Sequence, residues 1–310
     1  MRLGQAAVAV PLTNRRHVRR LSINPTGNEV VVGQKAHGRH RALSRWQLPD
    51  FTPLPGPDPC PFSADQDVCA VLVHGGDDIV AVAGLAEKQL SIINLTDGTT
   101  ARPVDGEVES VAIAGRLLAV TGAETKIISR ETGETVWQPD APDWADSDNS
   151  NPPIPIIAFN SSGDSFAIGG KGEEMIDQYS IDTGEITSTL SGAPPRLRWL
   201  GFSPGDGYLL AITPNTGAVT VWRAGETEPH LPDVFGSMDY TAAAFHPDGE
   251  HCAMGMWSGY LGIHRLSDGA NVETRAAHNS GLNALGFTPD GNFLLSGGDD
   301  GKLLVWEVLA

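Results

Sequence analysis

His278, Ser296 and Asp300 are the residue types that a hydrolase uses as base, nucleophile and orienting acid. Ser296 lies in the run Leu-Leu-Ser-Gly-Gly, which lacks the Gly-x-Ser-x-Gly turn that exposes a nucleophile. The chain also has no His-Glu-x-x-His pair and no phosphate-binding Gly loop that ends in Lys and Ser or Thr. We therefore predict no catalytic residue and no cofactor.

The sequence offers no cluster with metal-ligand spacing either. Asp146 to Ser150 resembles the start of a calcium loop, but the sixth position is not Gly, and Ile157 stands in place of the bidentate Glu. The three cysteines have no zinc spacing, and a reducing compartment is the simplest explanation of their number. No apolar run approaches the roughly 18 residues of a membrane span. We expect no metal site, no membrane association and a cytoplasmic location.

A tight-turn signature recurs along the chain with a period of roughly forty residues. In its strongest form Pro fixes one φ angle and Gly supplies a positive one, so that two flanking apolar strands reverse direction. A third strand and a second turn follow in most units, which predicts about four short strands per unit. The turns lie at residues 24–27, 74–77, 114–115, 160–163, 203–207, 246–249 and 288–291.

The last unit, from His278 to Trp306, resembles a WD repeat, which is the blade of a β-propeller. It contains Thr288-Pro-Asp-Gly291 and the run Gly-Gly-Asp-Asp-Gly ahead of Trp306. The resemblance implies that His278, Ser296, Asp300 and Trp306 form a hydrogen-bonded structural brace. In this family a Trp usually ends the third strand, and the matching positions here are Trp46, Ile93, Ile128, Tyr179, Trp222, His264 and Trp306.

Extended over the whole chain, the resemblance implies one all-β domain over residues 1–310, a seven-bladed propeller. Residues 1–13 are expected to form a closing strand that completes the last, C-terminal blade, because that unit stops after its third strand. The six prolines between Pro49 and Pro61 predict an extended segment outside the first blade. The blades are expected at approximately residues 14–61, 62–104, 105–139, 154–191, 196–233, 238–275 and 278–310, with an inserted acidic loop at 140–153.

Charge is distributed unevenly along the chain. The net charge is −17, which disfavours long nucleic acids as partners, yet residues 1–50 alone carry +7. The resemblance places two basic loops of the first blade side by side on the top face, with Arg19 extending the patch. Trp144 and Trp257 are candidate aromatic anchors for a partner. The basic candidates are Arg15, Arg16, Arg19, Lys35, His37, Arg39 and Arg41.

These observations favour a noncatalytic scaffold, a subunit or adaptor of a multiprotein assembly that binds other proteins through its top-face loops. An acidic or phosphorylated segment is the partner chemistry that the basic loops favour. Two blander interpretations stay open, namely that the basic loops pair with the protein's own carboxylates and that Trp257 packs locally. The alternative functions are a lactonase-like propeller enzyme with a central-channel metal and a reader of phosphorylated or acidic peptides.

Overall fold

The computed structural model describes residues 1–11, 17–34, 43–55, 68–73, 78–83, 89–94, 99–139, 154–214, 216–232 and 238–309. For residues 7–11, 68–73, 78–83 and 89 it describes the backbone only. Every regular element in these ranges is a β-strand, which confirms the all-β prediction. No helix among them is long and apolar enough to cross a membrane.

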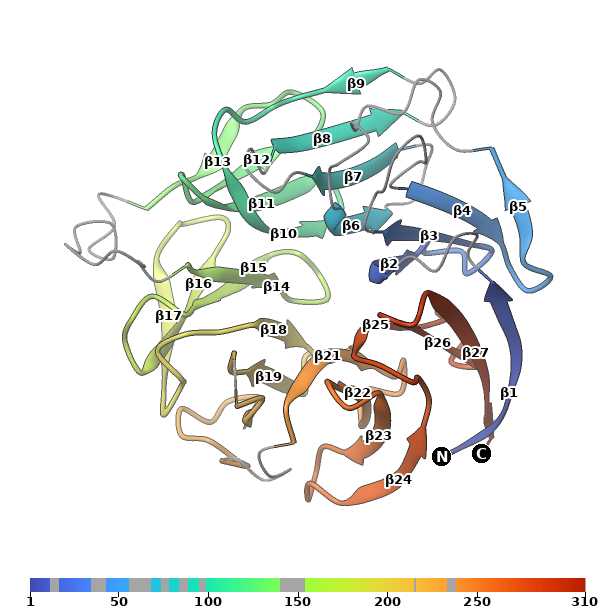
Figure 1. Ribbon diagram of the computed structural model, residues 1–310. Coiled ribbons are helices and arrows are strands. Elements are labelled where there is room, and N and C mark those ends of the chain that lie inside the picture. The colour runs from blue at the N-terminus through green and yellow to red at the C-terminus, as the bar shows by residue number, and fades with distance from the viewer. Residues whose placement is uncertain are drawn as a thin grey trace. The chain divides into compact units, whose positions relative to one another are not determined.

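The chain divides into two compact units, each described by itself. Unit 1 comprises residues 1–107, 241–265 and 270–310, and holds four antiparallel sheets that we call blades 1, 2, 6 and 7 (Figure 1). Blade 1 is β2 (Val18–Ile23), β3 (Glu29–Gln34), β4 (Leu43–Gln47) and β5 (Thr52–Leu54). Blade 2 is β6 (Val68–Val73), β7 (Asp78–Ala83), β8 (Gln89–Asn94) and β9 (Thr100–Ala101). Blade 6 is β21 (Tyr240–Phe245), β22 (His251–Met256), β23 (Tyr260–Arg265) and β24 (Asn271–Ala276). Blade 7 is β25 (Leu282–Phe287), β26 (Phe293–Gly298), β27 (Lys302–Leu309) and β1 (Arg2–Pro11).

Unit 2 comprises residues 108–240 and 266–269, and holds blades 3, 4 and 5. Blade 3 is β10 (Val108–Ala114), β11 (Leu117–Gly122), β12 (Lys126–Ser129) and β13 (Thr135–Trp137). Blade 4 is β14 (Ile156–Phe159), β15 (Ser165–Gly169), β16 (Met175–Ser180) and β17 (Ile186–Ser191). Blade 5 is β18 (Trp199–Phe202), β19 (Tyr208–Ile212) and β20 (Val219–Arg223).

Blade 5 departs from the predicted pattern of seven four-stranded blades. Among the described residues six sheets have four strands, whereas β18–β20 form a sheet of three. Within the described residues, the segment that follows β20 pairs with this strand only through an isolated bridge between Val221 and Leu231. Two backbone hydrogen bonds of 3.0 Å hold that bridge, which is too short to form a fourth strand. The prediction of a complete seventh four-stranded blade is therefore wrong for the described residues.

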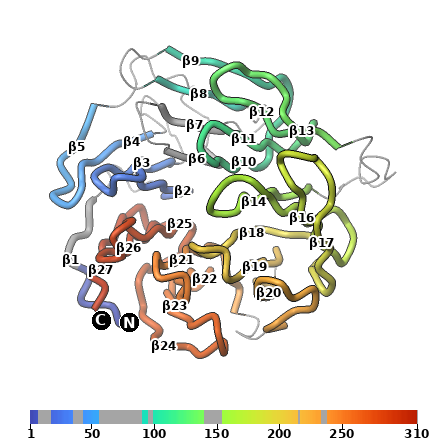
Figure 2. The backbone as a smooth tube through the Cα atoms, turned by 180° about the vertical axis from the view of Figure 1, so that it is seen from behind, coloured from blue at the N-terminus to red at the C-terminus, as the bar shows by residue number. Residues whose placement is uncertain are grey.

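The N-terminal strand completes blade 7 as the sequence predicted. β1 pairs antiparallel with β27, from Arg2 opposite Leu309 to Pro11 opposite Lys302. The two chain ends consequently lie side by side in both views (Figures 1 and 2). The start of the strand is also tied to β24, because Leu3 N–H donates to Glu273 Oε2 at 2.7 Å. Its side chain is buried in the core shared by blades 6 and 7.

Apolar cores fill the spaces between neighbouring blades within each unit. In unit 1 valines of β2 and β3 pack against leucines of β26 and β27. In unit 2 Leu117 and Ile127 of blade 3 pack in one cluster with Phe166 and Ile168 of blade 4. The seven positions matched to the family Trp all lie in third strands, each opposite the second residue of the neighbouring second strand. The repeat therefore sets the register of every blade.

The turn residues behave as the period predicted. Gly291 has a φ of +73° and donates its N–H to Thr288 O at 2.8 Å, closing the turn between β25 and β26. A side chain there would also collide with the ring of His246 from blade 6, 2.6 Å from the position of its Cβ. In the proline-rich segment Pro53 lies on β5, the outer edge of blade 1, opposite Trp46. An edge strand tolerates Pro because its missing N–H faces outward; residues 56–61 of that segment lie outside the described residues.

Candidate functional site

The four residues of the predicted brace form one chain of hydrogen bonds in blade 7. His278 Nδ1 lies 2.8 Å from Asp300 Oδ1, and its Nε2 lies 2.9 Å from Ser296 Oγ. Trp306 Nε1–H donates to the same Ser296 oxygen at 3.0 Å. These contacts fit a neutral imidazole that donates from Nδ1 and accepts the Ser296 hydroxyl proton at Nε2. The chain links the segment before β25, strand β26, the following turn and strand β27.

The same geometry resembles a Ser-His-Asp triad, but its burial argues against that chemistry. Ser296 has no exposed surface, and the His278 side chain is equally buried. A nucleophile must meet its substrate within about 3.5 Å, and Trp306 already occupies a hydrogen-bonding position on Ser296 Oγ. The arrangement therefore acts as a fully satisfied buried network, which stiffens the blade.

The carboxyl group of Asp300 is held in its charged form. Burial acts to raise its pKa, but the hydrogen bonds from His278 and from the backbone N–H groups of Asn279 and Lys302 act to lower it, and the pKa lies below the ordinary value. A charged acceptor strengthens its hydrogen bonds. The anchor of the network therefore persists at neutral pH.

Trp257 is the most exposed large apolar side chain of the described residues, with 60% of its surface accessible. It lies in the turn between β22 and β23, ahead of the half-exposed Tyr260. One edge of the indole lies close to Gly281, where a Cβ would stand 3.4 Å from Trp257 Cε3. The indole therefore rests one edge on the backbone before β25 and offers the rest to solvent.

The turn that carries Trp257 is fixed by its backbone. Gly259 N–H donates to Met256 O at 2.9 Å, and Gly259 O accepts from the N–H groups of Ala277 and His278 at 3.1 and 2.9 Å. Gly259 has a φ of +84°, and a Cβ there would lie 2.3 Å from His278 O. Only glycine allows this close approach. Because His278 belongs to the brace, these hydrogen bonds attach the turn that carries the exposed indole to the braced segment of blade 7.

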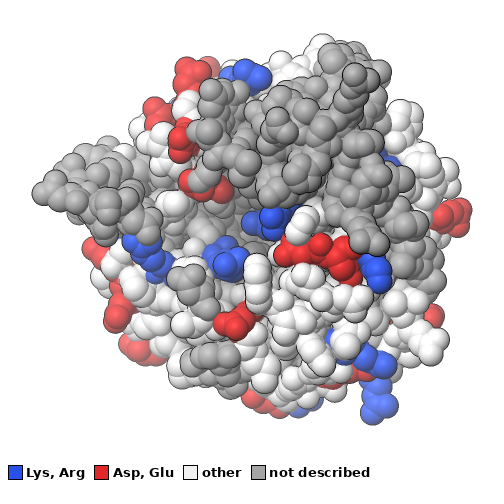
Figure 3. Space-filling view, in the orientation of Figure 1, with Lys and Arg blue, Asp and Glu red and all other residues white. Residues whose placement is uncertain are grey.

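Asp299 joins blades 1 and 7, and like Trp257 it lies close to Gly281. Its Oδ1 accepts from His17 Nδ1 at 2.7 Å and from Arg19 Nη1 at 3.2 Å. Asn283 Nδ2 donates to the same oxygen at 2.7 Å. Figure 3 shows acidic atoms bordered by basic atoms over the place that β25 has in Figure 1. For Arg19 this geometry favours the interpretation that basic residues pair with the protein's own carboxylates.

The other predicted partner-binding residues lie outside the described residues. They are Arg15, Arg16, Lys35, His37, Arg39, Arg41 and Trp144. The acidic loop 140–153 and its calcium-like segment lie outside them too. In the part of the chain that is described, no three His, Cys, Asp or Glu side chains are grouped as a metal ion requires. Sequence reasoning missed Asp299, because the resemblance assigns a role only to the second aspartate of the Asp299-Asp300 pair.

Comparison with known proteins points to one family. The model of the WD domain, G-beta repeat, matches residues 269–307. The chain is 27% identical over 152 residues to the WD repeat-containing protein SL1-17 of Schistosoma mansoni, covering 49% of this chain and 50% of that protein. It is 27% identical over 177 residues to the periodic tryptophan protein 2 homologue of Schizosaccharomyces pombe, covering 49% of this chain and 20% of that protein.

A third relative is the transcription initiation factor TFIID subunit 5 of Caenorhabditis elegans, 22% identical over 157 residues, which are 50% of this chain and 24% of that protein. The chain spans half or less of the length of these curated relatives. The matched repeat coincides with the described blade that carries the complete brace. The repeat match, the WD-repeat relatives and the recurring antiparallel sheets together support a WD-repeat β-propeller family for this chain.

Proposed function

We propose that this chain is a noncatalytic scaffold, a subunit or adaptor that binds another protein through the surface around Trp257. The observation that carries the proposal is an indole with 60% of its surface exposed on a turn whose backbone is fixed on both sides. Trp residues dominate the binding energy of many protein interfaces. An anchor that is already ordered loses little conformational entropy on binding.

The names of relatives support an assembly role. One relative is named as a subunit of TFIID, and another, from Dictyostelium discoideum, as a serine-threonine kinase receptor-associated protein. Both names describe proteins that work with other proteins. The three cysteines without metal spacing support a reducing, cytoplasmic location as part of the same proposal.

The scaffold proposal is tested by replacing the indole. Affinity capture from the source cells with the wild-type chain identifies partners, and each is then purified for titration against Trp257→Ala. Loss of a central Trp anchor should weaken binding by about 2 kcal/mol or more, roughly 30-fold in Kd. Ile186→Ala, which removes a half-exposed apolar side chain of unit 2, is the matched control and should leave Kd unchanged.

The stability of Trp257→Ala should differ from wild type by less than about 0.5 kcal/mol, because the side chain is mostly exposed. Equal capture and equal Kd for wild type and Trp257→Ala would refute the proposed surface.

The alternative function, a reader of phosphorylated or acidic peptides, is tested in the same assay by Arg39→Glu with Arg41→Glu. Loss of binding in that variant alone would move the binding surface to the basic loops.

A further inference from the structure

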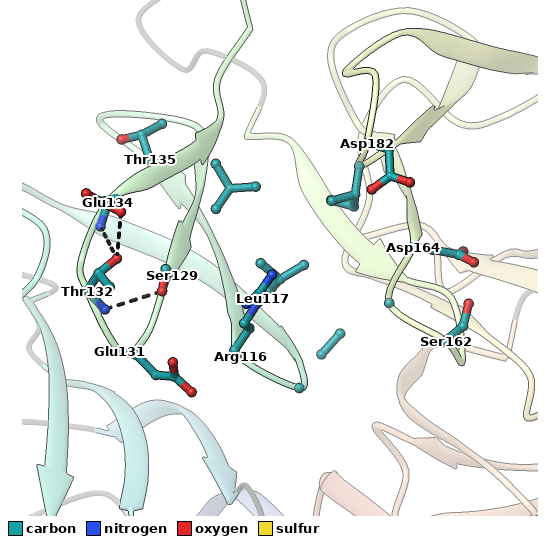
Figure 4. A pocket seen from close by; sticks show the side chains of 15 residues that line it. Arg116, Leu117, Ser129, Glu131, Thr132, Glu134, Thr135, Ser162, Asp164 and Asp182 are labelled. Atoms are coloured by element: carbon teal, nitrogen blue, oxygen red, sulfur yellow. Dashed lines mark hydrogen bonds between the residues drawn. The ribbon is translucent and has the colours of Figure 1, made fainter.

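Blades 3 and 4 of unit 2 enclose a groove of about 550 Å³ that the scaffold surface does not use (Figure 4). One wall is the turn from β12 to β13, and the other is formed by the turns that follow β14 and β16. The turn between β10 and β11 also lines the groove, with Arg116 and Leu117 between the two walls. All of these segments belong to the same compact unit, so the groove does not depend on how the two units are placed.

The walls of the groove are rigid. Gly163 and Ala114 from opposite blades approach so closely that a Cβ on Gly163 would lie 3.0 Å from the Ala114 Cβ. Trp137 at the end of β13 is buried against blade 4 and donates its indole N–H to Gly184 O at 3.4 Å. Backbone bonds of 2.8 and 2.9 Å close the turns at Gly133 and Gly184. The groove is therefore preformed, which lowers the entropy lost on binding.

The lining combines apolar and acidic groups. Leu117 and Ile181 contribute apolar surface, and Val136 on β13 lines the groove with 43% of its surface exposed. Four carboxylates border this surface and only one guanidinium opposes them. The charged residues of the lining are Glu131, Glu134, Asp164, Asp182 and Arg116.

Two of the carboxylates are available to a ligand. Glu134 and Asp164 are engaged locally, by Thr132 Oγ1 at 3.2 Å and by Asn160 Nδ2 at 2.8 Å. Glu131 and Asp182 are exposed on opposite walls (Figure 4), and within the described residues neither forms an ion pair. The groove therefore presents an apolar surface with an unpaired carboxylate on each side. A ligand that complements it has an apolar side chain with a cationic side chain on each side.

We propose that this groove binds an extended basic segment of a partner protein, in which an apolar side chain flanked by Lys or Arg rests on Val136. The apolar side chain gains burial against Leu117, Val136 and Ile181. The flanking cations meet Glu131 on one wall and Asp182 on the other. The surface is separate from Trp257, so each proposal stands or fails by itself.

The experiment measures fluorescence anisotropy of a labelled peptide Gly-Arg-Lys-Ile-Lys-Arg-Gly titrated with the full chain at low salt. We expect saturable 1:1 binding that weakens as salt rises. Glu131→Gln with Asp182→Asn should raise Kd about fivefold or more, and Val136→Ser about threefold. Glu173→Gln with Glu174→Gln removes the same charge from exposed residues of unit 2 outside the groove and should change Kd by less than about twofold.

The matched variants separate a groove from general attraction to an acidic protein. Equal weakening in both double variants, absence of saturation, or tighter binding of a peptide with Glu in place of Lys and Arg would overturn the proposal. Replacing the peptide Ile by a photoreactive benzoylphenylalanine gives a second readout. Crosslinks to residues 114–117, 129–136, 162–164 or 181–182 support the groove, and crosslinks confined to other residues contradict it.

Discussion

Blades 7 and 4 both contain buried polar side chains near the loop that joins their second and third strands. The two blades provide different bonding partners for these side chains. In blade 7 the indole, hydroxyl, imidazole and carboxylate form a continuous chain that includes a single formal charge. In blade 4 Lys171 forms an ion pair with Asp177, and Thr189 Oγ1 donates to Asp177 Oδ1 at 2.7 Å. The Lys171 and Asp177 side chains are only 9% and 11% exposed.

The aromatic residue of the third strand also has a different role in each of the two blades. Trp306 completes the polar chain of blade 7. Tyr179 of blade 4 instead stacks on Phe166, with ring centroids 5.0 Å apart and planes within 6°. In blade 4 the aromatic residue packs against another ring, and Lys171 and Asp177 supply the buried polar contacts instead. These two blades therefore satisfy buried polar groups near the same loop by different chemistry.

The outer strands give the largest contrast, because blade 4 uses its own β17 and blade 7 depends on β1 from the other end of the chain. A chain starting at Asn14 should lose on the order of 5 kcal/mol of stability, since it exposes the β27 edge and removes Leu3 from the core. Thermal unfolding measures the change. A synthetic peptide of residues 1–13 should restore part of the loss, because it binds only the folded chain. An unchanged melting temperature would mean that β1 contributes nothing to stability.

The ion pair of blade 4 should be the more fragile of the two braces. Asp177→Ala takes the carboxylate away from a buried ammonium, which typically costs about 3–5 kcal/mol. Urea unfolding measures it, with exposed Glu173→Ala as the control, expected within about 0.5 kcal/mol of wild type. Lys171→Met combined with Asp177→Leu should recover most of the loss, because apolar side chains of similar volume need no charged partner. If the double variant is as unstable as the single one, charge burial is not the cause.

The brace of blade 7 was predictable because its four residues have the spacing of a known repeat. The ion pair of blade 4 has no such spacing, so the sequence did not indicate it. His278, Ser296, Asp300 and Trp306 fall within one repeat at positions that the family fixes. Lys171 and Asp177 are six residues apart in a charged sequence, where such residues usually indicate a solvated surface.

The candidate surfaces were less predictable because they combine residues from different repeats. Trp257 was predicted as an anchor, but its fixed turn depends on backbone atoms of His278, which no pattern in the sequence indicates. Asp299 and the groove each bring together residues of two blades. At His264 the family Trp is replaced, and burial lowers the pKa of its imidazole to about 4, so the residue is neutral at physiological pH. A sequence shows such a substitution but not how its surroundings accommodate it.

Asp300→Ala should have the smallest effect of these changes, about 2 kcal/mol, because it removes one charged acceptor from a network of neutral groups. The effect also has a definite pH dependence. The folded-state pKa of Asp300 lies below its unfolded value, so its stabilisation is complete above the unfolded pKa, near 4, and disappears as the pH falls through the folded-state value. Urea unfolding of wild type and Asp300→Ala at pH 7 and pH 3 tests both points: the difference should shrink at pH 3. A difference that stays constant would show that Asp300 acts through packing, and the contrast between a charged anchor in blade 7 and an ion pair in blade 4 would then be wrong.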